Sequence, residues 1–225
     1  MPMVGEELQR LWAADLAEVL VWCEAYTNDF QSPAEYAALF RYAAGWLCPA
    51  ECDAVVEIGS YEGQTDVVLS RALETRRRRL GLPAEALVAV DPCEGLEAVN
   101  GQPHGIGWLT FAEWHAFLRR HDAYGQVVPL VATTAQALPL LRRFRARMML
   151  IDGDHFLPAV RMDADLADEI VAPGGVALFH DCDRADRPNS VHHEVEPEAW
   201  RLVNSGRWAL LERMDSMMVL EKTEG

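Results

Sequence analysis

Three ionisable side chains lie within four positions of the segment IDGDH, residues 151–155, which directly follows an apolar run. Asp152, Asp154 and His155 could form a metal site, provide a base or cap the helical pattern that begins immediately afterwards. Asp154 suits the helix cap, because a carboxylate placed before a helix meets free N–H groups there. Asp152 and His155 are therefore the residues of this segment that we expect to carry chemistry.

A second candidate site lies in the segment EIGSYEG, residues 57–63, where Gly59 and Gly63 separate a strand pattern from a helical one. Glycines let a ligand approach the backbone, and the start of a helix offers free N–H groups. Asp91 ends the next predicted strand, where an acid can accept hydrogen bonds from both hydroxyls of a ribose. The combination indicates a cofactor that contains a nucleoside. A tight turn and a loop-capping aspartate are the structural alternative.

Short apolar runs alternate with helical patterns from about residue 53 onwards. The runs are continuously apolar, as is typical of parallel strands covered on both faces, and their order predicts a Rossmann-like, doubly wound α/β sheet. Only Met214 and Asp215 separate the last two runs, which predicts an antiparallel hairpin. The predicted strands cover residues 53–58, 86–91, 127–131, 148–151, 175–180, 208–213 and 216–221, and the helices between them cover residues 65–78, 111–121, 134–144 and 156–170.

The first fifty residues contain two further amphipathic patterns, at about residues 5–24 and 33–47. Ser32 and Pro33 stand as N-cap and first residue of the second helix. We expect an N-terminal helical extension over residues 1–50, acting as a lid or in substrate or oligomer contacts, followed by a cofactor-binding domain over residues 51–225. Ligands of such a sheet bind beyond the carboxyl ends of its strands.

Composition excludes several classes of protein. The formal charge of −15, from 35 acidic and 20 basic residues, repels phosphate backbones and disfavours a nucleic-acid partner. No apolar run approaches the roughly 18 residues that span a bilayer, and the acidic start MPMVGEELQR is unlike a signal peptide, so we expect a cytoplasmic protein without membrane contact. The five scattered cysteines, without CxxC pairs, argue against a disulfide framework and against structural zinc.

The segments VVEIGSYEGQT, VAVDP, MMLIDGDH and PGGVALFHD, taken together, resemble class I S-adenosylmethionine-dependent methyltransferases. The resemblance is to the small-molecule O-methyltransferase branch that includes the macrolide-sugar and macrocin O-methyltransferases, and it covers about residues 50–221. The combined spacing of ExGxxxG and DGxH…GG…D is more specific than either motif alone. The resemblance implies S-adenosylmethionine as cofactor, a small-molecule acceptor and an antiparallel final hairpin.

The resemblance also implies a set of cofactor-binding residues. It comprises Glu57, Gly59, Ser60, Gly63, Asp91, Thr133, Thr134 and Asp152. Within this set the glycine turn would pass beside the methionine part of the cofactor, with Glu57 supporting the turn. Asp91 would hold the ribose, and the two threonines would lie near the adenine.

Catalytic and metal-binding roles follow from the same resemblance. His155 matches the general base of the macrolide-sugar enzymes, and Asp152 is the second catalytic candidate. In the resembling sugar enzymes a strand-end aspartate and a following acidic pair bind magnesium, and the matching set here is Asp152, His180 and Asp181. His180 replaces an acid in this set. Because Mg²⁺ prefers oxygen ligands, the replacement weakens the prediction of magnesium or favours another divalent metal.

Two other functions remain open from the sequence. A nicotinamide-dependent oxidoreductase would share the sheet, but this chain lacks GxGxxG and predicts a hairpin where a parallel strand belongs. A non-catalytic cofactor-binding protein is the other, and the combination of Asp152, His155 and Asp181 argues against it. Sugar hydroxyls, other alcohols, phenols and amines all suit these residues as acceptors, and a homo-oligomer is compatible with them.

Two regions outside these motifs also carry expectations. We expect the loop at residues 96–110 to contribute to the acceptor pocket, and the helix that follows it to pack against the core. We expect Asp163, Asp165 and Asp168 to lie on a solvated helix face.

Overall fold

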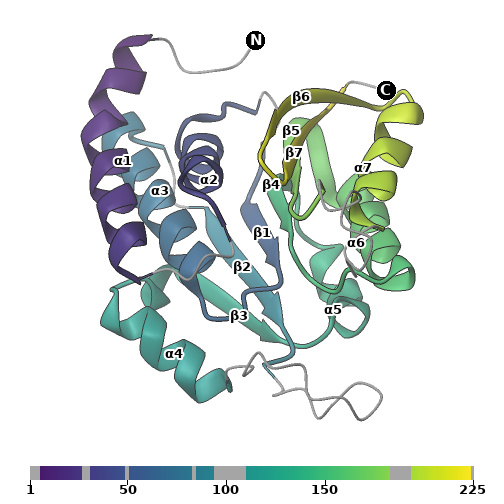
Figure 1. Cartoon of the computed structure of the whole chain (residues 1–225), viewed down its shortest axis with the longest axis horizontal. Coiled ribbons are helices and arrows are strands. Elements are labelled where there is room, and N and C mark those ends of the chain that lie inside the picture. The colour runs from purple at the N-terminus through teal and green to yellow at the C-terminus, as the bar shows by residue number, and fades with distance from the viewer. Residues whose placement is uncertain are drawn as a thin grey trace.

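The computed structural model describes residues 6–26, 31–48, 51–82, 85–93, 110–182 and 194–223. These residues form a seven-stranded sheet in the order β3-β2-β1-β4-β5-β7-β6, with helices on both faces (Figure 1). Neighbouring strands from β3 through to β5 are parallel, whereas β7 runs antiparallel to both β5 and β6. The predicted Rossmann-like α/β fold with an antiparallel C-terminal hairpin is therefore confirmed.

The strands are β1 (Ala54–Ile58), β2 (Ala86–Asp91), β3 (Val127–Val131), β4 (Ala146–Ile151), β5 (Val171–Phe179), β6 (Trp208–Met214) and β7 (Met217–Lys222). The helices are α1 (Glu6–Tyr26), α2 (Pro33–Gly45), α3 (Gln64–Leu80), α4 (Phe111–Arg120), α5 (Thr134–Leu141), α6 (Leu157–Ile170) and α7 (Val195–Asn204), with a short 3-10 helix at Tyr124–Gln126.

Most boundaries agree with the prediction within two residues, but those of β5 and α5 do not, since α5 ends at Leu141 rather than at residue 144. The strand β5 begins at Val171 rather than at residue 175, because Val171 pairs with Ala146 across an irregular step in the register. Tertiary pairing thus carries the strand through Pro173 and Gly174, which break strand patterns in the sequence. The helix α7 was not predicted at all.

Alternate residues of each central strand face two separate apolar layers. Val55 of β1 belongs to the layer that contacts α1, α2, α3 and α4, whereas Val56 belongs to the layer that contacts α5, α6 and α7. Both sides of the sheet are therefore covered, as the continuously apolar strands predict. None of the helices in the described ranges combines the length and apolar character needed to cross a bilayer.

The helix α2 is anchored at both of its ends. Ser32 caps its start in a reciprocal capping box with Glu35, as predicted for Ser32 and Pro33. At its other end, the buried guanidinium of Arg147 in β4 donates hydrogen bonds to the carbonyl oxygens of Tyr42 (3.0 Å) and Ala43 (2.9 Å). A cation at this end complements the helix dipole, so α2 is fixed relative to the sheet.

Candidate active site at the carboxyl edge of the sheet

Backbone hydrogen bonds bring the ends of four parallel strands together. The N–H of Gly59 after β1 donates to Val90 of β2 (2.9 Å), and the N–H of Asp152 after β4 donates to Ile58 of β1 (2.9 Å). The N–H of His180 after β5 donates in turn to Ile151 of β4 (3.1 Å). The strand order reverses between β1 and β4, where ligands of such sheets bind.

The turn between β1 and α3 requires its glycines. Gly59 and Gly63 have φ angles of +89° and +84°, which disfavour any other residue. A Cβ atom on Gly59 would lie 2.2 Å from the backbone oxygen of Asp152, and one on Gly63 would lie 3.1 Å from Trp114. The turn therefore brings backbone close to the neighbouring strand end, as both the structural and the cofactor interpretation require.

Asp91 ties the second strand end to this turn. Its Oδ2 accepts a hydrogen bond from the N–H of Tyr61 (3.0 Å) and its Oδ1 one from the N–H of Cys93 (2.7 Å). Both donors have positive φ angles, a strained conformation that is concentrated at functional sites. Each carboxylate oxygen keeps a second lone pair for a ribose hydroxyl, so the assignment of Asp91 to the ribose remains a prediction that the geometry permits.

Glu57 lies beneath the turn, where it is fully buried and accepts a hydrogen bond from the hydroxyl of Thr65. Burial and the neighbouring Asp66 raise its pKa well above the ordinary value. Asp66, also fully buried, accepts a hydrogen bond from the indole of Trp114 (2.8 Å), and burial raises its pKa to about 6. Glu57 thus joins the end of β1 to the first turn of α3. Sequence reasoning missed Asp66, whose hydrogen bond with Trp114 connects α3 to α4.

The threonines after β3 have a capping role. Thr133 is exposed and caps α5, accepting a hydrogen bond from the N–H of Gln136 (3.4 Å), while Thr134 begins the helix. Their predicted proximity to adenine remains a prediction. The predicted pocket loop lies outside the described residues except for Thr110, which caps α4.

Asp163 of α6 is buried, with 1% of its surface exposed, so the predicted solvated face is wrong for this residue. Its side chain points towards Gly153 in the turn after β4 and contacts Thr134, and burial raises its pKa to about 7. Asp165, two residues further on, is exposed as expected. Asp168 is mostly buried and accepts a hydrogen bond from the indole of Trp208 (2.9 Å). The acids of α6 thus lie on more than one face of the helix, and their spacing in the sequence did not show which of them would be buried.

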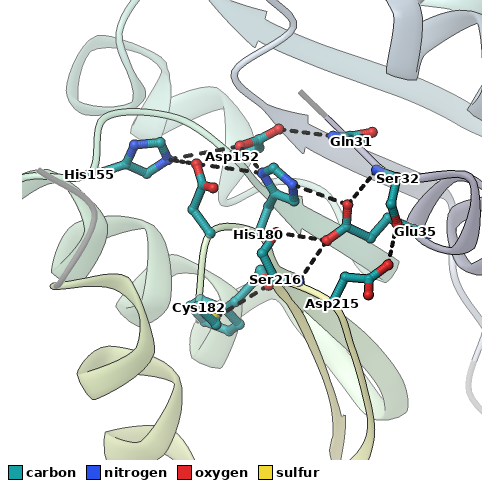
Figure 2. A network of polar contacts seen from close by, with 11 residues as sticks. Gln31, Ser32, Glu35, Asp152, His155, His180, Cys182, Asp215 and Ser216 are labelled. Carbon is teal, nitrogen blue, oxygen red and sulfur yellow. Dashed lines mark hydrogen bonds and ion pairs between the residues drawn. The ribbon is translucent and has the colours of Figure 1, made fainter. Parts of the chain in front are cut away.

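His155 faces two carboxylates at the edge of the sheet (Figure 2). Its Nε2 lies 3.5 Å from Oδ2 of Asp181 and 3.8 Å from Oδ1 of Asp152, and 19% of its side chain is exposed. Asp181 has a φ angle of +61°, a further strained position at a strand end. The structure thus brings together the three residues whose combination argued for chemistry.

The start of α6 differs from the prediction. Phe156, not Asp154, occupies the N-cap position, and the carboxylate of Asp154 accepts a hydrogen bond from the N–H of Phe156 (3.0 Å). Glu194, distant in sequence, accepts the hydrogen bond of the first helical N–H, that of Leu157. A distant residue thus satisfies one of the free N–H groups at the start of α6, and His155 lies in the turn that precedes the helix.

His180 is buried between two carboxylates (Figure 2). Its Nδ1 lies 2.9 Å from Oδ1 of Asp152, and its Nε2 lies 3.7 Å from Oε2 of Glu35, an ion-pair distance. Burial opposes the charge on His180, but Asp152 and Glu35 raise its pKa well above the ordinary value. Burial likewise opposes ionisation of Asp152, but His180 and His155 hold the pKa of Asp152 well below its usual range.

His180 is the member of the predicted magnesium set that suits this ion poorly. It offers nitrogen where Mg²⁺ prefers oxygen, and both of its ring nitrogens face carboxylates. Among the described residues, Asp152, His155 and Asp181 place one potential ligand atom each within 4.8 Å of one another. Two carboxylates and one imidazole suit a softer divalent ion better than magnesium.

Glu35 and Gln31 of the N-terminal segment, and Ser216 of the β6–β7 hairpin, also reach this edge, and sequence reasoning missed all three. Glu35 stands in a capping box, and Ser32 donates its backbone N–H to Oε2 of Glu35 (2.7 Å). The capping box is enough to account for Glu35 from the sequence alone. The contact of Glu35 with His180 could not be predicted, because these residues lie far apart in the chain.

Comparison with known families gives a match over more than half of the chain. A family model described as a methyltransferase domain matches residues 56–182, from β1 to just past β5. No protein with curated function matches the sequence.

Several solved structures share the fold. The O-methyltransferase TomG from Streptomyces achromogenes, involved in tomaymycin synthesis and solved with S-adenosylmethionine, is 15% identical, with a TM-score of 0.60 over 93% of this chain and 90% of its own. The O-methyltransferase NovP is 13% identical, with a TM-score of 0.66 over 86% of this chain and 81% of its own. MycE, from the mycinamycin biosynthetic pathway and solved with Mg and S-adenosylhomocysteine, is 14% identical, with a TM-score of 0.55 over 93% of this chain and 55% of its own.

Proposed function

This chain belongs to the family of methyltransferase domains, and from that premise we propose that it transfers a methyl group from S-adenosylmethionine to a hydroxyl group of a small molecule. The observation that carries the proposal is the convergence of two groups of residues at one sheet edge. Asp91 and the glycine turn form the side suited to a nucleoside, and His155 with Asp152 and Asp181 forms the side suited to an acceptor. A methyl donor and a hydroxyl must meet between such groups.

The cofactor half of the proposal rests on the β1–α3 turn and Asp91. The glycines bring backbone N–H groups to the start of α3, and Asp91 presents a carboxylate beside them. TomG and MycE, which share the fold, were solved with S-adenosylmethionine and S-adenosylhomocysteine. The acidic charge of the chain also suits a sulfonium cation.

When bound, S-adenosylmethionine supplies an electrophilic methyl group on a sulfonium. The chain must then hold the acceptor in line and remove its proton as the new O–C bond forms. His155 suits this task because its imidazole is partly exposed and faces the carboxylates of Asp152 and Asp181, which orient the ring and stabilise the charge it gains. Asp152 is the weaker proton acceptor, because His180 and His155 hold its pKa low.

The proposed steps need no divalent ion, because His155 takes the proton while Asp152 and Asp181 face its ring. The nicotinamide-dependent alternative loses its support, since the matching family is one of methyltransferase domains and the sheet ends in an antiparallel hairpin. A sugar or natural-product hydroxyl is the acceptor class that we propose, in keeping with the named O-methyltransferases of the same fold.

Calorimetric titration tests the cofactor half directly. We expect S-adenosylhomocysteine to bind and NAD not to bind. Asp91→Ala should lower the affinity for S-adenosylhomocysteine about ten-fold or more, since hydrogen bonds to a charged acceptor contribute roughly 1–3 kcal/mol. Asp53→Ala is the matched control, because Asp53 also accepts a backbone hydrogen bond, from Arg145 (2.9 Å), but lies at the opposite end of β1.

A methyl-transfer assay over sugars, other alcohols, phenols and amines then tests the acceptor class. Transfer to hydroxyl acceptors supports the proposal. Binding of NAD in place of S-adenosylhomocysteine, or transfer to amines alone, would overturn it.

A further inference from the structure

The first turn of α2 lies outside the segment that matches the methyltransferase family, yet it reaches the candidate active site (Figure 2). The family match begins at residue 56, whereas Gln31 and Glu35 belong to the N-terminal segment.

Glu35 is 2% exposed, and both of its carboxylate oxygens are engaged. Oε1 accepts hydrogen bonds from the backbone N–H (2.9 Å) and the hydroxyl (2.7 Å) of Ser216, in the β6–β7 hairpin. Oε2 accepts the backbone N–H of Ser32 (2.7 Å) and faces Nε2 of His180 at 3.7 Å. One carboxylate thus joins α2, the hairpin and the end of β5.

The same contacts continue to Asp152. The other ring nitrogen of His180 lies 2.9 Å from Oδ1 of Asp152, and the side-chain amide of Gln31 donates to Oδ2 of Asp152 (3.1 Å). The two oxygens of Asp152 are therefore held by donors that depend on the N-terminal segment, while Oδ1 also lies 3.8 Å from His155. The orientation of Asp152 towards His155 depends on α2.

Stability alone is a poor explanation for this buried chain of charges. Taking carboxylates and an imidazole out of water costs free energy that their mutual attraction often only offsets, and apolar residues fill the same space at no loss. Arg147 and Arg76 already anchor the far end of α2 through backbone carbonyls. The contacts of Glu35 instead fix the orientation of His180 at the sheet edge, and methyl transfer there depends on oriented groups.

We propose that Glu35 is a positioning residue for methyl transfer, which holds His180 and through it Asp152, so that α2 completes the active site. The inference rests on the proposed function. Because Glu35 contacts neither His155 nor the cofactor turn, it acts through the His180 ring.

Glu35→Gln tests the proposal with the full chain. We expect kcat to fall about 10- to 100-fold, as is usual when a group that orients a catalytic side chain is removed. The affinity for S-adenosylhomocysteine should change by less than about threefold, because the glycine turn and Asp91 are untouched. Glu198→Gln is the matched control, since Glu198 is equally buried (2% exposed) but pairs with Arg161 of α6 and Arg201 of α7. The control should keep its kcat.

A double-mutant cycle separates positioning from a general structural effect. If Glu35 acts through His180, then Glu35→Gln combined with His180→Asn should be no slower than His180→Asn alone. If Glu35→Gln does not fold, Ser216→Ala removes one donor from Glu35 and should show the same selective loss of kcat on a smaller scale.

The outcomes separate the two claims. Suppose that the wild-type chain transfers methyl groups. An unchanged kcat in folded Glu35→Gln, or additive losses in the double-mutant cycle, would then overturn the positioning role alone. Equal losses of kcat and cofactor affinity would also overturn it, because they indicate a structural role. A wild-type chain that does not bind S-adenosylhomocysteine would overturn the proposed function itself and the inference with it.

Discussion

His155 and Asp152 both lie within reach of an acceptor, but their surroundings suit them to different tasks. Asp152 accepts hydrogen bonds from Gln31 and His180, and its pKa is held low, so its carboxylate is a stable anion and a weak base. His155 lies at the partly open side of the same group and faces Asp152 and Asp181 through one nitrogen. An imidazole that gains a proton beside two carboxylates is stabilised by them.

His155→Ala should therefore lower methyl transfer by about 100- to 10,000-fold, the usual contribution of a positioned base. Cofactor affinity should barely change, because His155 faces the acceptor side. The measurement is kcat with the acceptor found in the screen, together with titration of S-adenosylhomocysteine. His115→Ala is the control, since His115 of α4 packs against Phe111 and against Tyr124 of the 3-10 helix that follows. Near-normal turnover of His155→Ala would transfer the role to Asp152.

The same assay in excess EDTA tests whether a metal takes part. We expect turnover to persist and added Mg²⁺ to leave it unchanged, because the proposed base is His155 and both ring nitrogens of His180 face carboxylates. If turnover stops in EDTA and returns with a softer divalent ion, then Asp152, His155 and Asp181 form the metal site, and His155 is a ligand rather than the base.

At the scale of elements, the site depends on the close approach of two turns. The β1–α3 turn passes so near the end of β4 that a methyl group on Gly59 would overlap the backbone oxygen of Asp152. The turn proposed to bind the cofactor and the proposed active-site residue Asp152 are therefore parts of one close contact. A change in one turn must move the other.

Gly59→Ala should disrupt both halves of the site. The new Cβ would lie 2.2 Å from the Asp152 oxygen, so S-adenosylhomocysteine binding should be lost and the melting temperature should fall. Gly81→Ala is the matched control: Gly81 also has a positive φ, at +63°, but nothing lies within 4 Å of its Cβ position. The free energy of unfolding of Gly81→Ala should fall by only about 1–2 kcal/mol, because alanine is disfavoured in the left-handed conformation, and the variant should still bind S-adenosylhomocysteine. Equal behaviour of the two variants would contradict the close-approach argument.

At the scale of the whole molecule, a chain with a formal charge of −15 also buries several acids. Burial raises the pKa of Asp163 to about 7 and that of Asp66 to about 6. An acid whose pKa is raised by folding binds more protons in the folded state than in the unfolded state. Stability therefore falls as the pH rises between the two values.

For Asp163 this interval runs from its ordinary pKa of 3.8 to about 7. Below pH 3.8 the carboxyl of Asp163 is protonated in both states and does not lower the free energy of unfolding. Above about pH 7 it is charged in both states, and its buried charge lowers the free energy of unfolding by the full amount. Between pH 5 and pH 8 the free energy of unfolding of wild type should therefore fall by about 2–3 kcal/mol more than that of Asp163→Asn. Urea unfolding at the two pH values measures this difference. Asp165→Asn, at an exposed site on the same helix, should show the wild-type pH dependence. A parallel pH dependence of Asp163→Asn and wild type would refute the argument.

The sequence by itself determined the sheet and most of its strand ends. Short, continuously apolar runs between helical patterns are typical of strands covered on both faces, and parallel strands bring their carboxyl ends to one edge. The positions of Gly59, Gly63 and Asp91 could therefore be predicted, as could those of Asp152, His155 and Asp181. These residues follow their strands directly, so local pattern and chain order are enough to locate them.

Only the tertiary structure decided which of these groups meet, and what else meets them. Glu35 reads in the sequence as half of a capping box, but α2 packs so that its carboxylate faces His180, far away in the chain. Asp163 reads as a solvated acid, but the rotation of α6 on the sheet buries it behind Gly153. Burial and contacts between distant segments follow from how helices pack on the sheet, and spacing along the chain does not specify that packing.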